Sequence, residues 1–91
     1  MRNATTNSNV REKIIAIMAE VTGCSTKKIW GGTKIEKVFE SLGDDDVGKY
    51  LDFCEMLEET FSIKLSTDEC IDILSHTLLA LEIRISKKMK Q

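Results

Sequence analysis

Apolar side chains recur at helical spacing through the middle of the chain. From Val47 to Phe61 they lie three or four residues apart, which places them along one stripe of an amphipathic helix. Three aspartates, residues 44–46, come directly before this stripe and offer N-cap oxygens and negative charge, both of which favour a helix start. The pattern predicts a helix of about 16 residues that begins near Asp46. Its apolar stripe comprises Val47, Tyr50, Leu51, Phe53, Cys54, Leu57 and Phe61.

Another amphipathic segment comes earlier in the chain. Its apolar stripe starts at Val10, directly after an N-cap pattern in which Asn9 is followed three residues later by Glu12. Gly23 can supply the left-handed backbone that ends many helices. These signals predict a helix over residues 10–22.

Two further helices are expected after the central one. Residues 62–65 form a short linker, and Ser66 with Glu69 then matches the Ser-x-x-Glu capping box that begins a short helix. A last helix is predicted over residues 77–88, where apolar residues again fall at helical spacing and lysines suit the C-terminal end of the dipole.

The segment between the first two helices, residues 23–45, holds four of the five glycines and has no clear period. We expect a long connection with a helical turn at 34–41. It would lie across the helices and be pinned by Ile29, Trp30, Ile35, Val38, Phe39 and Leu42. The predicted fold is all-α, a four-helix bundle of three longer helices and one short helix with a long first loop.

Composition describes one small globular domain. The chain has 91 residues, of which 42% are hydrophobic and 31% charged, and no apolar run approaches the roughly 18 residues of a membrane span. Residues 1–8 are polar, so we expect a disordered tail before a domain at 9–91. The start lacks the apolar core of a secretory signal, which favours a cytoplasmic location, and a monomer is expected.

No pattern in the chain indicates catalysis or a zinc or redox site. The three cysteines lack the spacing of zinc or redox motifs and are expected to be buried thiols. The single histidine, His76, has no placed carboxylate or nucleophile beside it. The lysines near the C-terminus are too few for a membrane tether. We therefore expect neither an enzyme nor a membrane-bound protein.

Negative charge is concentrated on the central helix. Residues 44–61 contain seven acidic residues and one lysine, although the whole chain has a net charge of only −2. Clustered like charge speeds encounter with basic partners and argues against nucleic acid, whose binding proteins need a basic stripe. The sequence predicts that a basic partner surface docks on Asp44, Asp45, Asp46, Asp52, Glu55, Glu58 and Glu59.

Several segments in order resemble the acyl carrier protein family. They are residues 10–23, residues 39–43 and residues 51–65, with the family's Leu-Glu-Glu-x-Phe helix end matched by residues 57–61 and its acidic turn by Asp68-Glu69. The resemblance implies a four-helix carrier of fatty-acid, polyketide or related biosynthesis whose second helix docks basic surfaces of enzymes. In that family an Asp-Ser-Leu motif at the start of this helix carries 4'-phosphopantetheine on its serine.

The chain departs from the family at this serine. The ungapped match from Phe61 puts Val47 at the position, and the match from Leu42-Gly43 puts Asp46 there. Valine has no nucleophile, and an aspartyl phosphate would be a labile acyl phosphate. We therefore expect a carrier-like, non-catalytic docking module that lacks phosphopantetheine at the usual position, and no cofactor is assigned.

Two alternatives stay open. In the first, Ser41 of Glu40-Ser41-Leu42 bears the arm of a working phosphopantetheinylated carrier. In the second, the chain is a calcium-binding helical protein whose ion loop runs from Asp44 to Glu55. The sixth position of that loop is Lys49, where the sharp turn needs glycine, so no metal ligand is assigned.

Overall fold

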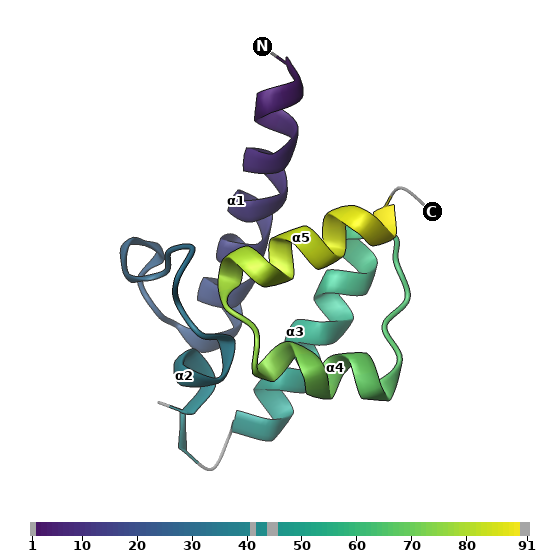
Figure 1. Ribbon diagram of the computed structural model, residues 1–91. Helices are drawn as coiled ribbons and strands as arrows, with labels where there is room; N and C mark the ends of the chain where they lie inside the picture. Colours follow the sequence, from purple (N-terminus) through teal and green to yellow (C-terminus); the bar gives the residue numbers. More distant parts are fainter. Residues whose placement is uncertain (1, 41, 44–45, 90–91) are drawn as a thin grey trace.

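The computed structural model describes the backbone of residues 2–40, 42–43 and 46–89, and the side chains of these residues except 2–8 and 46. It is all-helical, as predicted (Figure 1). The described residues contain no strand, and a single antiparallel β-bridge joins Lys34 to Thr77. The elements in chain order are α1 (Arg2–Thr22), the 3-10 turn η1 (Thr26–Lys28), α2 (Ile35–Glu40), α3 (Asp46–Phe61), α4 (Thr67–Leu74) and α5 (Leu78–Met89).

Three long helices surround the core. α1 contacts both α3 and α5, and the shorter α2 and α4 close the end where α3 begins (Figure 1). Phe53 and Leu57 of α3 are fully buried, as are residues of α1, α4 and α5. Phe39, Tyr50 and Phe53 form an aromatic cluster with ring centroids 5.2 to 6.0 Å apart. The core therefore draws on every α-helix of the described chain.

The central helix and the end of α1 agree with the sequence. α3 covers the predicted 16 residues from Asp46. Gly23 has a φ of +78°, and its N–H donates to the Ala19 carbonyl at 2.7 Å, which ends α1 as predicted. The start of α1 differs, because the helical backbone begins at Arg2 rather than Val10. The described buried residues of α1, from Val10 to Val21, follow the predicted apolar period, whereas the helical backbone itself begins earlier.

The capping and periodicity signals in the sequence predict the starts of α4 and α5 to within one residue. Ser66 and Glu69 form the expected capping box at the start of α4. α5 begins at Leu78, one residue after the predicted start, and is separate from α4. The helical turn expected within the long connection is a complete helix, α2. The described chain therefore has five α-helices instead of four.

The long connection is fastened to the junction of α4 and α5 by main-chain hydrogen bonds. The N–H groups of Leu78 and Leu79 donate to the carbonyls of Thr33 and Gly31 at 2.8 and 2.9 Å. Because the first N–H groups of a helix have no partner within the helix, these loop carbonyls cap α5. Trp30 in this loop is 68% exposed, so the expectation that it pins the connection to the core was wrong.

Candidate functional site: the acidic face of α3 and the adjoining groove

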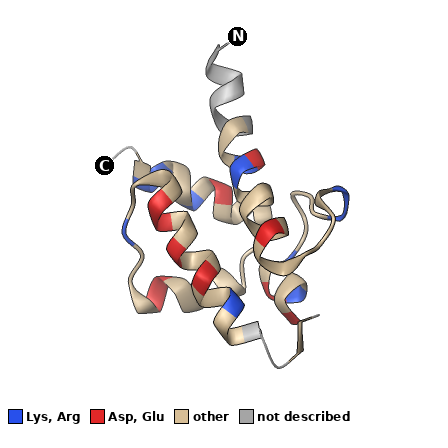
Figure 2. Cartoon of the chain, turned by 180° about the vertical axis from the view of Figure 1, so that it is seen from behind, with Lys and Arg blue, Asp and Glu red and all other residues tan. Residues whose placement is uncertain are grey.

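The outward side of α3 carries a row of carboxylates (Figure 2). Asp52, Glu55 and Glu59 are exposed, and none of them forms an ion pair within the described part of the chain. Lys49 is the single basic residue of this helix and lies one turn before Phe53. A helix surface left with uncompensated negative charge can attract a cationic partner.

Three carboxylates elsewhere in the structure lie close to cationic partners. Glu82 lies 2.8 Å from Arg11, and Glu69 lies 2.8 Å from Lys88. Asp72 lies 3.9 Å from Arg84. The fold pairs these three carboxylates, whereas the exposed carboxylates of α3 have no ion pair in the described part of the chain, as is also true of Glu12, Glu20, Glu36 and Asp68.

Glu58 has a different role from its neighbours on α3. Its Oε2 accepts the backbone N–H of Leu65 at 2.8 Å, and its side chain is half-buried. The sequence grouped it with the docking carboxylates, but it also holds the linker between α3 and α4. No local motif signals this bond, since it joins residues seven positions apart across a helix end.

The acidic surface extends from α3 to α1. A shallow cleft of about 290 Å³ lies between these helices and is lined by Glu20 of α1 together with Lys49, Asp52 and Glu55 of α3. Glu20 was not among the predicted docking residues, because helical periodicity alone cannot tell which exposed faces of two helices meet.

The start of α3 does not match the predicted apolar stripe. Tyr50, Phe53, Cys54, Leu57 and Phe61 are buried, as expected. Val47 and Leu51 are 67% and 58% exposed instead, because they line an open groove between α2, α3 and α4.

The two residues that the sequence matches put at the expected attachment position, Asp46 and Val47, both lie in the first turn of α3. Ser41, Asp44, Asp45 and the side chain of Asp46 lie outside the described residues. The helical backbone from Asp46 onward replaces most of the loop that a calcium site would need. The described residues also contain no group of three His, Cys, Asp or Glu side chains placed to hold a metal ion.

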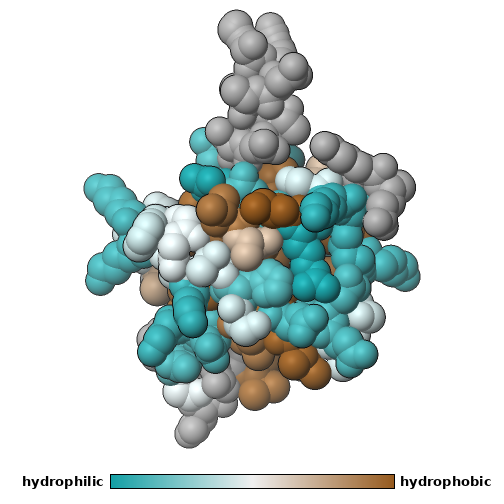
Figure 3. Space-filling model, viewed as in Figure 1, coloured by the Kyte–Doolittle hydropathy of each residue, from teal (hydrophilic) through white to brown (hydrophobic). Residues whose placement is uncertain are grey.

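An apolar groove of about 410 Å³ lies where α2, α3 and α4 meet. Phe39 and Tyr50 are its buried residues, and Val47, Leu51 and Ile71 are its exposed apolar ones. Figure 3 shows hydrophobic atoms in the lower part of the molecule, where α4 and the start of α3 lie in Figure 1. The remaining lining residues are Glu36, Glu40, Thr67, Cys70 and Leu74.

Two cysteines lie beside the groove. The Tyr50 hydroxyl donates a hydrogen bond to the Cys70 carbonyl and so links α3 to α4. Burial raises the pKa of Tyr50, and burial likewise raises the pKa of Cys54 to about 12, which keeps this thiol protonated and unreactive. Cys54 is buried as predicted, whereas Cys24 and Cys70 are only half-buried.

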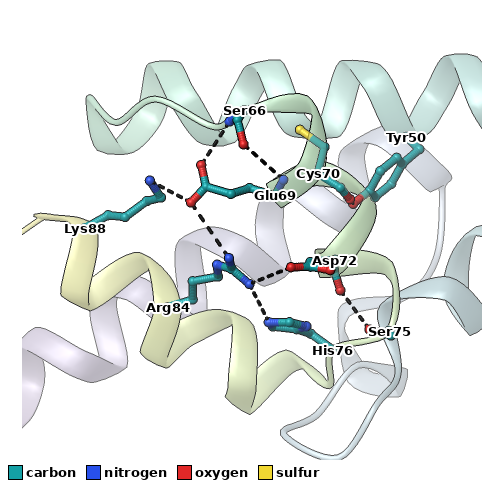
Figure 4. A network of polar contacts seen from close by, with 9 residues as sticks. All are labelled: Tyr50, Ser66, Glu69, Cys70, Asp72, Ser75, His76, Arg84 and Lys88. Atoms are coloured by element: carbon teal, nitrogen blue, oxygen red, sulfur yellow. Dashed lines mark hydrogen bonds and ion pairs between the residues drawn. The ribbon is translucent and has the colours of Figure 1, made fainter.

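A polar network sets the position of α4 against α5 (Figure 4). Glu69 accepts the N–H of Ser66 at 2.9 Å through Oε1, and its Oε2 lies 2.8 Å from Lys88 and 3.8 Å from Arg84. Arg84 also donates to Nε2 of His76 at 3.1 Å. The hydrogen bonds from Lys88 and Ser66 hold the pKa of Glu69 below its usual range. The network therefore supports the helix that forms one wall of the groove.

Comparison of the chain with protein-family models, with curated proteins and with solved structures gives no significant match. Within the described residues, no helix has both the length and the apolar character needed to cross a bilayer.

Proposed function

We propose that the protein is a non-catalytic docking module of the acyl-carrier type that presents the acidic face of α3 to a basic surface on a partner protein. The observation that carries this proposal is the set of exposed carboxylates on α3, Asp52, Glu55 and Glu59, which have no ion-pair partner among the described residues. Exposed charges of one sign steer association with an oppositely charged surface.

The carrier part of the proposal is supported by the resemblance in sequence and by the order of the long helices. In this proposal α3 corresponds to the carrier's second helix, and its first turn contains Asp46 and Val47 in place of the serine. A valine side chain cannot form a phosphodiester, so a module of this kind would bind partners without carrying a thioester itself. Fatty-acid, polyketide or a related biosynthesis is the setting that the resemblance implies.

Charge reversal at the centre of the acidic face tests partner binding. Proteins retained from a cell lysate by the immobilised chain are compared with those retained by Glu55→Lys and by a matched control, Glu12→Lys, on the exposed side of α1. Both variants change the net charge by the same amount. We expect Glu55→Lys to lose basic proteins that Glu12→Lys keeps. Equal retention by the two variants would contradict the assigned face.

The absence of the arm is tested separately by intact mass. The chain is incubated with coenzyme A and a promiscuous phosphopantetheinyl transferase, beside a working carrier protein as a positive control. We expect no change in mass. Addition of one phosphopantetheine group would contradict the proposal and favour the alternative in which Ser41 bears the arm, which peptide mapping would then locate.

A further inference from the structure

The groove between α2, α3 and α4 has a feature that the acidic face of α3 does not explain. Val47, Leu51 and Ile71 are all more than half exposed and lie beside the buried rings of Phe39 and Tyr50. Each exposed aliphatic side chain would gain free energy if a partner removed it from water. Exposed apolar residues grouped in this way mark interaction sites more often than scattered ones do.

Carboxylates border the groove on all three helices. Glu36 and Glu40 lie one turn apart on α2 and line the groove directly. Glu55 follows Leu51 by one turn on α3, and Asp68 precedes Ile71 by three residues on α4, so each is a neighbour of an apolar wall residue. The border is therefore acidic on several sides.

Little positive charge balances this border. Among the described residues, Glu36, Glu55 and Asp68 have no ion pair, and Glu40 has only a 4.0 Å contact with the exposed Lys37. An apolar strip between negative edges is complementary to a segment with an apolar stripe between positive edges.

We propose that this groove binds an amphipathic helical segment of a partner protein, with large apolar side chains on one side and Lys or Arg along both flanks. The apolar side chains enter the groove and displace its water, and the cations face the carboxylates of α2, α3 and α4. This inference rests on the proposed function, because it specifies which part of the partner reaches the chain beside the acidic face.

Charge also argues against an anionic membrane as the occupant of the groove. An anionic membrane surface would be repelled by the same carboxylates.

A designed peptide tests the inference directly. The full chain is titrated by calorimetry with a 14-residue peptide of leucine and lysine whose leucines follow helical spacing. The controls are a peptide of the same composition in scrambled order and one with glutamate in place of lysine. We expect binding of the first peptide with a negative heat-capacity change, and at least tenfold weaker binding of both controls. Equal binding of the scrambled peptide would overturn the inference.

Paired variants locate the binding site. Ile71→Ser removes an exposed wall of the groove, and Ile83→Ser removes an isoleucine of similar exposure from α5, outside the groove. We expect Ile71→Ser, and independently Leu51→Ser, to weaken peptide binding about tenfold, and Ile83→Ser to leave it unchanged. Thermal unfolding confirms that each variant is folded. Equal affinities of Ile71→Ser and Ile83→Ser would overturn the inference.

The outcomes also separate this inference from the proposed function. If Glu55→Lys loses lysate partners while Ile71→Ser keeps both those partners and the peptide, the acidic face stands and the groove assignment fails. If Ile71→Ser loses the peptide while Glu55→Lys keeps every lysate partner, the groove assignment stands and the docking face fails. Concentration-dependent dimerisation that Ile71→Ser abolishes would show that a second copy fills the groove, and this would overturn the inference.

Discussion

Two glycines have open space around them, and their substitution by alanine is expected to change the free energy of unfolding in opposite directions. A Cβ added to Gly23 or to Gly48 would have no neighbour within 4 Å, so sterics do not distinguish them. Gly23 has a left-handed backbone at the end of α1, whereas Gly48 lies in the first turn of α3. Backbone conformation alone therefore decides the sign of the effect.

We expect Gly48→Ala to raise the free energy of unfolding by up to about 1 kcal/mol, because alanine favours the helix and restricts the unfolded chain. Gly23→Ala should lower it by about 1 kcal/mol, because a side chain strains the left-handed region. Urea unfolding of both variants measures the two changes. Shifts of the same sign would contradict this account.

At the scale of elements, the depressed pKa of Glu69 links the docking of α4 on α5 to pH. The folded-state pKa lies below the usual 4.5 of a glutamate. The stabilisation is therefore fully present above about pH 4.5 and is lost as the pH falls through the lower folded-state value. Acidification should therefore weaken the contact between α4 and α5, whereas this contact stays intact at neutral pH.

We expect Glu69→Gln to lower the melting temperature at pH 7 and to have a smaller effect at an acidic pH below the folded-state pKa of Glu69, where the parent carboxylate is itself protonated. Melting curves followed by circular dichroism across this range give the comparison. Asp68→Gln is a suitable control, since Asp68 lies in the same turn and has no ion pair in the described structure. An equal loss at both pH values would contradict the role assigned to the Glu69 carboxylate.

Local sequence signals correctly predicted the starts of α3 and α4. The capping box of Ser66 and Glu69 and the 16-residue helix from Asp46 depend on neighbouring residues, so the sequence contains what determines them. The exposure of Leu51 depends instead on which helices cover α3, and periodicity is the same for a covered and an uncovered stripe. The groove and the bond from Leu65 to Glu58 likewise come from distant segments that meet only in the fold.

At the scale of the whole molecule, one ion pair joins the first and last helices. Arg11 of α1 donates from Nε to Glu82 of α5 at 2.8 Å. The Glu82 side chain is 7% exposed and that of Arg11 44%. Removing the arginine would leave a buried carboxylate without its partner, which is costly because few other groups can solvate it.

We expect Arg11→Ala to lower the free energy of unfolding by about 2 kcal/mol. Adding Glu82→Leu should restore much of that loss, because the buried charge is then removed as well. Denaturant unfolding of the single and double variants measures both effects. A double variant less stable than Arg11→Ala would show that Glu82 contributes through other contacts.

The carbonyls of Gly31 and Thr33 that cap α5 couple two distant parts of the chain. Lifting the glycine-containing loop would uncap the helix, so the loop cannot open while the first turn of α5 stays intact. In amide hydrogen exchange, the N–H groups of Leu78 and Leu79 should accordingly exchange together with the loop, as one cooperative opening unit. The exposed Trp30 belongs to that unit, and its fluorescence can therefore report when the start of α5 frays.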